Sequence, residues 1–454
     1  MNVQTERTEL SFEDQLSINL FQFWQFISQP QKYSSLFRER YGDFLITNYR
    51  RELGAIAFTS KGARQILLGD PDGYDAFWKA GFTGVTGPAS IWVLGEEKHR
   101  RERQLLVPAF HGSGFSKYGR VIREITNRQT RKFKPGQTVR AIETTLSISL
   151  DVIMQIVFGV EDEQVMREGS KILSALLRTI HPLIVFFPKL QRRWFPPWMQ
   201  HVRAKAEFLN WLNRCLIERR ARKAQADDLL GRMMTARYED GSRMQDEDIR
   251  DELITILLAG HETTATALAW ALYELGRHPA ELKKLRAEIA NLGPDPDPGI
   301  VVKLPYLSAV CNETMRLHTL LPEVARVLTS PFKFFNYTLP PGAYVLVSIM
   351  SIHHDKALYP NPDQFIPDRF VGRTYSPFEF LPFGGGHRRC LGAGLSDYEM
   401  RIVLAEIVTH WEFEPAAVEQ DIRHDLAMGP KNGVPLHING CIGAKAAVPF
   451  RQNE

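Results

Sequence analysis

The apolar stretch Leu253–Leu272 constrains the fold of this chain more than any other part of the sequence. Its twenty residues are enough to span a bilayer, yet His261 and Glu262 stand near its centre. A carboxylate at the middle of a bilayer costs about 2.5 kcal/mol or more. Acidic residues precede the stretch, and ArgHisPro at 277–279 suits a helix end. The pattern predicts a helix over Asp246–Arg277, roughly 48 Å long at about 1.5 Å per residue, in the core of a large protein.

The rest of the chain predicts a mainly helical protein with a minor β component. Helical periodicity runs from about Phe115 to Arg316, and strand-like segments are short, at 43–49, 55–59 and 343–348. No internal repeat, low-complexity segment or long linker stands out in the 454 residues. We therefore expect one domain over residues 1–454.

Charge, cysteine content and the N-terminus exclude several classes of protein. The net charge is +4, and no basic stripe carries interleaved aromatics, so nucleic acid is not an expected partner. The four cysteines are scattered without a CxxC pair, which indicates a reducing interior and no disulfide scaffold. No basic segment followed by an apolar one marks a signal peptide, and the apolar residues 16–27 are too short for a membrane span. These features predict a cytoplasmic protein.

The segment Phe383–Gly392, FGGGHRRCLG, points to a metal ligand at Cys390. Its three glycines permit tight turns and a close approach to something flat. A helical pattern begins after Gly392, so the cysteine lies just before a helix N-terminus, where free amides and the helix dipole stabilise a thiolate. A metal binds the thiolate form, and Arg388 adds positive charge nearby. Two alternatives stay open: a buried structural cysteine and, less favoured, a phosphate loop that lacks its usual GK[ST].

A second segment, Ala259–Thr264 or AGHETT, lies near the middle of the predicted long helix. The Thr263 hydroxyl can bond the main-chain carbonyl four residues back and bend the helix, and Gly260 removes bulk beside it. The resulting notch would hold dioxygen and water, and Glu262, expected to be buried, suits proton delivery together with Thr263. HisGlu also begins an HExxH zinc motif, but residue 265 is alanine, so the second ligand is missing. Alone, the segment is explained equally well as a polar break in a core helix.

Three further patterns carry weight only in combination. Glu313 and Arg316 are three residues apart and share a helix face, where they can pair. The loop Phe365–Phe370 is rich in proline and holds one arginine. His99 and Arg103 are four apart on a helix that ends near residue 108, so both can point at one anionic group. A solvated basic helix is the simpler interpretation of the last pair.

Together and in this order, these segments resemble the cytochrome P450 superfamily. The resemblance covers the chain from about residue 41 to the C-terminus, and the cysteine motif is its most specific part. The matching positions are Phe383, Gly386, Arg388, Cys390 and Gly392 for FxxGxRxCxG, Ala259, Gly260, Glu262 and Thr263 for AGxET, Glu313 and Arg316 for ExxR, and Pro367, Arg369 and Phe370 for PxRF. Asp368 stands where the family usually has Glu, a mild departure.

The resemblance implies a triangular, mainly helical body with a smaller sheet region and haem b between two long helices. Cys390 would bind the iron through sulfur, with Phe383 packed near that sulfur. Glu313, Arg316 and Arg369 would form a salt-bridge cluster behind the haem. The other residues expected at the haem are His99, Arg103, Arg326 and Arg388, which would hold its propionates, and Ala259, Gly260, Gly384 and Gly392, which would line it.

The resemblance also implies a monooxygenase that activates O2. A thiolate pushes electron density onto iron and favours O–O cleavage, while Glu262 and Thr263 would supply protons. The central helix and segments 77–92, 183–198 and 320–324 would contact the substrate. They are rich in Phe, Trp, Leu and Ile, which favours a small hydrophobic molecule, foremost a long-chain fatty acid or a terpenoid. Residues 183–198 are a candidate membrane-touching lip. Glu323 is expected to face solvent rather than the pocket.

The absence of an anchor likens the chain to the soluble bacterial members, which take electrons from a separate ferredoxin or flavodoxin. A basic patch of Lys98, Arg100, Arg101 and Arg389 would dock such an acidic donor, and the protein would be a monomer. Two rival functions remain: a haem-thiolate peroxygenase or isomerase, which normally lacks the acid–alcohol pair, and a non-catalytic haem-binding protein.

Overall fold

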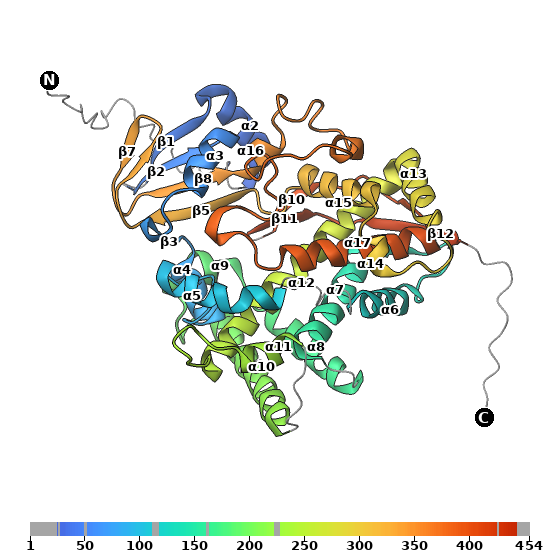
Figure 1. Cartoon of the computed structure of the whole chain (residues 1–454), viewed down its shortest axis with the longest axis horizontal. Coiled ribbons are helices and arrows are strands. Elements are labelled where there is room, and N and C mark those ends of the chain that lie inside the picture. Colours follow the sequence, from blue (N-terminus) through green and yellow to red (C-terminus); the bar gives the residue numbers. More distant parts are fainter. Residues whose placement is uncertain are drawn as a thin grey trace.

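A large helical body and a smaller β-sheet region make up the protein (Figure 1). The computed structural model describes residues 25, 28–49, 52–110, 118–159, 163–221, 228–424 and 426–442. Its main helices are α2 (Pro30–Tyr41), α3 (Ser60–Leu67), α4 (Lys79–Thr86), α5 (Glu96–Leu106), α6 (Tyr118–Thr130), α7 (Ala141–Phe158), α8 (Glu163–Leu177), α9 (Pro182–Phe186), α10 (Pro196–Ala221), α11 (Leu229–Thr235), α12 (Asp246–Arg277), α13 (Pro279–Ala290), α14 (Pro298–Val301), α15 (Pro305–Leu317), α16 (Ile349–His353) and α17 (Ala393–His410). The mainly helical prediction is confirmed.

Helix α12 runs through the centre of the helical body, and its bounds are those predicted from the sequence (Figure 1). Its first turn holds three acidic residues, which the positive end of the helix dipole favours. The helix packs against α7, α15 and α17, and its side chains are buried over residues 253–257 and 264–275. The central helix is therefore a continuous core helix in which the run of buried side chains is broken at residues 258–263.

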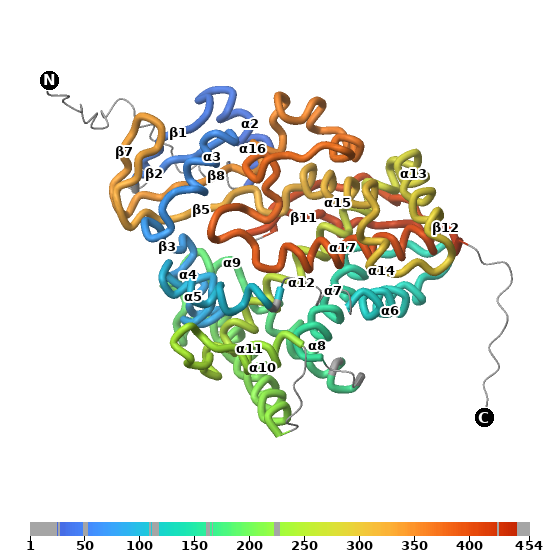
Figure 2. The backbone as a smooth tube through the Cα atoms, viewed as in Figure 1, coloured from blue at the N-terminus to red at the C-terminus, as the bar shows by residue number. Residues whose placement is uncertain are grey.

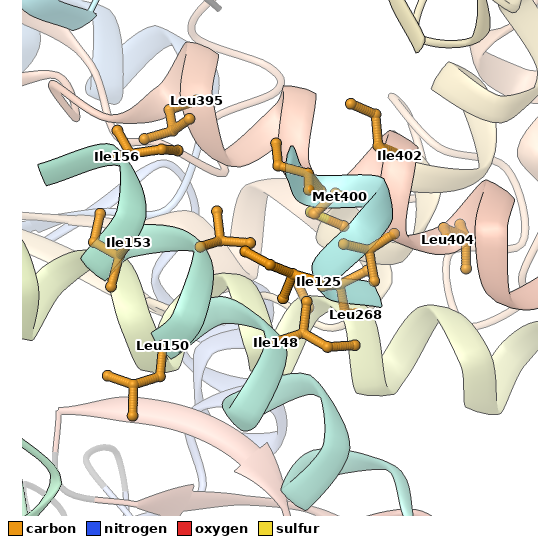
Figure 3. Close-up of a cluster of buried hydrophobic side chains, with 14 of the residues drawn as sticks. Ile125, Ile148, Leu150, Ile153, Ile156, Leu268, Leu395, Met400, Ile402 and Leu404 are labelled. Atoms are coloured by element: carbon orange, nitrogen blue, oxygen red, sulfur yellow. The ribbon is translucent and has the colours of Figure 1, made fainter. Parts of the chain in front are cut away.

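The main hydrophobic core lies where α6, α7, α12 and α17 meet. Figure 3 shows Ile148 of α7 close to Leu268 of α12, and Ile156 of α7 close to Leu395 of α17, in one buried cluster. These aliphatic side chains are buried and close-packed, so the relative position of the four helices is well determined. This core fixes α17, which follows the cysteine loop, beside α12.

The largest sheet brings the N-terminal strands against strands from the last third of the chain. Its order is β1-β2-β8-β5-β3, in which β2 and β8 are parallel and the other pairs antiparallel. Figure 2 shows the blue N-terminal strands beside the orange ones. The strands are β1 (Phe44–Tyr49), β2 (Glu52–Ala57), β3 (Tyr74–Ala76), β5 (Glu323–Leu328) and β8 (Tyr344–Ser348). Three of them confirm the predicted strand segments, although β2 begins three residues early.

Three small sheets complete the structure. They join β4 (Thr138–Arg140), β12 (Pro435–Cys441) and β9 (Trp411–Pro415), pair β6 (Phe332–Phe334) with β7 (Tyr337–Leu339), and pair β10 (Asp421–His424) with β11 (Ala427–Pro430). Within the described residues, α7 is the one helix long and apolar enough to cross a membrane, and 61% of it is buried in the protein. Its packing against α6 and α12 accounts for that composition.

Candidate active site

The cysteine loop folds tightly between Leu381 and the start of α17. The Cys390 amide donates to the Phe383 carbonyl at 2.9 Å, which closes the loop. Gly384 and Gly386 have φ values of 65° and 69°, where glycine is favoured. A Cβ atom on Gly386 would also stand 2.3 Å from the Leu67 carbonyl oxygen. Two of the three consecutive glycines are therefore required by the backbone itself.

Cys390 keeps accessible surface on the N-terminal side of α17. Burial raises the pKa of this thiol. Hydrogen bonds from the main-chain amides of Gly392 and Ala393, together with the charges of Arg389 and Arg103, act in the opposite direction. These donors sit at the N-terminus of α17 and stabilise the thiolate once a metal displaces the thiol proton.

The hydrogen bond predicted for Thr263 is present, within a helix that is continuous over Asp246–Arg277; residues 258–263 are called the notch below. Thr263 Oγ1 donates to the Ala259 carbonyl at 2.8 Å, and Ser149 of α7 donates to the Gly260 carbonyl at 3.3 Å. One turn on, Thr266 Oγ1 donates to the Glu262 carbonyl at 2.8 Å. Side-chain hydroxyls thus compete with main-chain amides for three carbonyls within four residues, which loosens a helix locally.

The expectation that Glu262 is buried is wrong, because its side chain is exposed. Gly260 and Thr264 lie on the covered face of the helix, where Ser149 of α7 and Ser396 of α17 contact them. Glu262 is about 200° around the helix from both and points to the uncovered side. His261 does not line the notch: burial lowers its pKa to about 4, and it hydrogen-bonds the Leu146 main chain.

The cysteine helix and the notch helix are joined directly. Thr264 Oγ1 and Ser396 Oγ are 3.0 Å apart, which connects the middle of α12 to the first turn of α17. Cys390 precedes α17 by three residues, so the sulfur and the notch lie on adjoining elements (Figure 1). The predicted iron ligand and the predicted oxygen site are thereby brought to one region of the protein.

The predicted propionate ligands also come together. His99 and Arg103 lie on α5, Arg326 on β5 and Arg388 in the cysteine loop, and mutual electrostatic effects connect the four. Burial lowers the pKa of His99 to about 3, helped by the charge of Arg388, so this imidazole is neutral. Burial and Arg388 likewise lower the pKa of Arg326 to about 10. The cluster places three partly buried guanidinium groups beside the neutral His99.

This surface fits a group that carries two carboxylates. Arg388 pairs with Glu96 at 2.6 Å, but no carboxylate pairs with Arg103 or Arg326 among the residues that the structure describes. Buried cations without a partner are costly. A flat porphyrin with two propionates would supply the missing anions here, while Cys390 reaches its metal. The residues present therefore fit haem b.

Behind this region, Glu313 forms a fully buried network with two arginines. Its carboxylate accepts from Arg316 at 2.7 Å and from Arg369 at 3.0 Å. Arg316 also donates to the His353 carbonyl, and the Leu381 amide donates to His353 Nε2 at 2.9 Å. Since an amide can only donate, Nδ1 of His353 carries the proton and faces Thr319 Oγ1. The network thus connects α15 to the start of the cysteine loop.

Comparisons with known proteins agree with this geometry. Residues 15–436 match the cytochrome P450 family. The chain is 32% identical to cytochrome P450 138 of Mycobacterium tuberculosis over 430 residues, which covers 91% of this chain and 93% of that protein. It is 31% identical to cytochrome P450 135A1 of the same organism, which covers 92% and 91%.

The chain belongs to the cytochrome P450 family. It is therefore a haem-thiolate monooxygenase that binds haem b. A solved structure of retinoic acid-bound cyanobacterial CYP120A1 shares the fold, with a TM-score of 0.80, 21% identity and coverage of 91% of this chain and 95% of that one.

Three residues of this P450 site were not identified from the sequence. Glu96 accepts from Arg388 and lies 3.1 Å from Nε2 of His387, and the His387 ring stacks on Tyr74. Glu96 precedes His99 by three residues on one helix, so their shared face was a usable signal. The stacking of His387 on Tyr74 joins a loop to a distant strand and leaves no local pattern.

Two expectations about charged residues need correction. Glu323 does not face solvent: it is largely buried and forms an ion pair with Arg423 of β10. Arg100 and Arg101 were predicted to be part of a free basic patch, but each forms an ion pair, with Asp72 at 2.6 Å and with Asp240 at 2.8 Å. In both cases a residue distant in sequence supplies the opposite charge.

The Glu313 network yields a prediction about stability. Glu313→Gln removes the carboxylate that two buried guanidinium groups share, so we expect the free energy of unfolding to fall by about 3–5 kcal/mol. Urea unfolding of the haem-loaded protein measures this loss. The matched control is Asp368→Asn, which breaks the exposed ion pair with Lys284 and should cost at most about 1 kcal/mol. Equal losses in the two variants would contradict the structural role of Glu313.

Proposed function

We propose that this P450 hydroxylates an elongated apolar substrate, a long-chain fatty acid or a terpenoid. The observation that carries the proposal is an apolar cluster beside the α12 notch. Phe82 and Val85 of α4 and Ile184 and Val185 of α9 are buried together, and Leu258 at the start of the notch packs against them. Apolar surroundings of this kind next to the notch favour an apolar substrate with few polar contacts.

The bound molecule in CYP120A1 supports the same chemistry. Retinoic acid combines an isoprenoid chain with a carboxylate, so it shares features with both substrate classes. The segments that would contact substrate here include aromatic residues at the rim, among them Trp92, which packs on Phe82 with ring centroids 5.1 Å apart. A flexible apolar chain packs against such rings more readily than a polar substrate does.

A titration of the purified ferric protein tests the substrate class. A substrate that displaces water from the iron shifts the haem from low to high spin, and the absorption spectrum reports the change. We expect long-chain fatty acids or terpenoids to produce the shift at lower concentration than small aromatic or sugar-like compounds. A response confined to polar compounds would overturn the proposal.

The chemistry of oxygen activation belongs to the bound haem, whose thiolate-ligated iron favours cleavage of dioxygen. The chain's contribution is the handling of protons at the notch. We propose that the Thr263 hydroxyl, held on the Ala259 carbonyl, orients water there. Glu262 is exposed, so its carboxylate can exchange protons with solvent and pass them on.

A threonine variant tests this proton role. Thr263→Ala should divert electrons from product to hydrogen peroxide, because proton delivery at the notch is lost. Peroxide and hydroxylated product are measured per electron pair consumed. Thr255→Ala is the matched control, since it removes a hydroxyl with the same kind of bond, to the Asp251 carbonyl of the same helix but outside the notch. Coupling that is identical in wild type and Thr263→Ala would exclude the assignment.

We propose a ferredoxin or a flavodoxin as the electron donor. Lys98 of α5 and Arg389 of the cysteine loop are exposed and make no ion pair within the described part of the chain, so they remain available to an acidic partner. Lys98→Glu should slow reduction by reduced ferredoxin and weaken its dependence on salt. Lys134→Glu, at an exposed position between α6 and β4, is the control. An unchanged rate and salt dependence in Lys98→Glu would count against this surface.

We propose one domain over the whole chain, in a cytoplasmic monomer that contacts membrane at its rim. The continuous core from α5 to β12 supports the single domain.

Phe187 and Trp194, which are 55% and 69% exposed and lie near Arg192 and Arg193 in the sequence, support the membrane contact. Failure to sediment with anionic vesicles would exclude that contact, and a dimeric mass in solution would exclude the monomer.

A further inference from the structure

One carboxylate lies within the group of arginines that the haem propionates are expected to meet. Glu96 begins α5, and its side chain is buried. Arg388 Nε donates to Glu96 Oε1 at 2.6 Å, and Arg388 Nη2 donates to the Leu94 carbonyl at 2.7 Å. These bonds hold two of the three guanidinium nitrogens, while Nη1 makes no hydrogen bond within the described part of the chain. Glu96 therefore fixes the orientation of Arg388.

The second oxygen of Glu96 also faces the cysteine loop. Glu96 Oε2 lies 3.1 Å from Nε2 of His387, whose ring stacks on Tyr74 of β3 with the ring centroids 6.0 Å apart. The Tyr74 hydroxyl donates to the Ile66 carbonyl at 2.9 Å, which holds that ring in place. Burial acts to raise the pKa of Glu96, but its contacts with His387 and Arg388 outweigh burial and lower the pKa. Glu96 is thus a negatively charged group with both oxygens held.

The other two guanidinium groups reach this place from different elements. Arg103 follows Glu96 by seven residues on α5, two turns along one face of the helix. Arg326 of β5 stands opposite Ala76 of β3, so its side chain lies on the same face of the sheet as Tyr74, two residues before Ala76. Both arginines are partly buried, and neither forms an ion pair with a carboxylate that the structure describes. Glu96 is therefore the carboxylate that the three arginines have in common.

Glu96 makes the charge of this group equal and opposite to that of the propionates. Arg103, Arg326 and Arg388 carry three positive charges, and Glu96 carries one negative charge. His99 adds none, because burial lowers its pKa to about 3. Two positive charges are left, which matches two ionised propionates. Without Glu96, this edge of the haem would keep one surplus positive charge in a partly buried place, where salt screens charges weakly.

A surplus charge at the edge of the haem acts on the iron. Reduction of ferric haem adds one electron, so a nearby positive charge favours the reduced form and a nearby negative charge disfavours it. We propose that Glu96 is a positioning residue for the haem, which orients Arg388, balances its charge and thereby lowers the reduction potential of the bound iron. The inference rests on Arg103, Arg326 and Arg388 facing the propionates.

The test is a redox titration of the haem-loaded protein without substrate, with dithionite as the reductant and the absorption spectrum as the readout. Wild type is compared with Glu96→Gln, Arg388→Gln and the double variant that carries both changes. The matched control is Glu97→Gln, which removes the same charge from the next residue of α5, where the side chain is exposed. Titration at about pH 8 keeps ordinary histidine side chains uncharged. The potential does not depend on turnover.

Glu96→Gln should raise the reduction potential. We expect the ratio of reduced to oxidised protein at a fixed potential to rise on the order of tenfold, the effect of one charge at an effective dielectric constant of about 20, which is an upward shift of about 59 mV. Arg388→Gln should lower the potential, because a positive charge is lost. The double variant restores the count of charges and should lie near wild type. Glu97→Gln should match wild type, because water and salt screen an exposed charge.

An unchanged potential in Glu96→Gln would overturn the inference, as would a double variant whose potential stays as high as that of Glu96→Gln. If Glu96→Gln takes up no haem, the double variant decides: restored uptake supports the balance of charges, and uptake that stays lost contradicts it. Failure of the propionate assignment has a different signature, because Arg388→Gln would then change neither haem uptake nor the potential, whatever Glu96→Gln does.

Discussion

The structure depends on holding one negatively charged sulfur inside a large protein. An anion in such a place needs fixed donors, and here they are main-chain amides of Gly392 and Ala393 at the start of α17. The loop reaches this position because Gly384 and Gly386 adopt backbone angles that other residues avoid. The charges of Arg103 and Arg389 act on the sulfur electrostatically and also favour the thiolate. In the cysteine motif, main-chain amides therefore provide the donors that stabilise the thiolate.

Contacts elsewhere in the protein fix the position of that loop relative to the notch. The Glu313 network holds α15 and, through His353, the residue that begins the cysteine loop. On the other side, Thr264 and Ser396 join α12 to α17. The aliphatic core around Leu268 and Met400 excludes water from these contacts (Figure 3). A polar network that is buried and satisfied in this way specifies one arrangement of the helices.

Much of this was predictable from the sequence, for identifiable physical reasons. The bounds of α12 follow from an apolar run with acids before it and ArgHisPro after it, and the Thr263 bond to Ala259 follows from helix spacing alone. The pairing of Glu313 with Arg316 also follows from spacing, whereas the arrival of Arg369 required the family resemblance.

What could not be predicted depends on tertiary contacts. The exposure of Glu262 is set by which face of α12 the neighbouring helices cover. The partners of Glu323, Arg100 and Arg101 come from elements far away in the chain.

The central claim is that Cys390 supplies the sulfur that binds the haem iron. The most direct measurement is the carbon monoxide difference spectrum of the reduced protein, expressed with ample haem, for wild type, Cys390→His and the control Cys441→Ser at the exposed end of β12. Wild type and the control should give the spectrum characteristic of a thiolate-ligated haem, and Cys390→His should lose it. A wild-type protein that takes up no haem, or a histidine variant with an unaltered spectrum, would contradict the account.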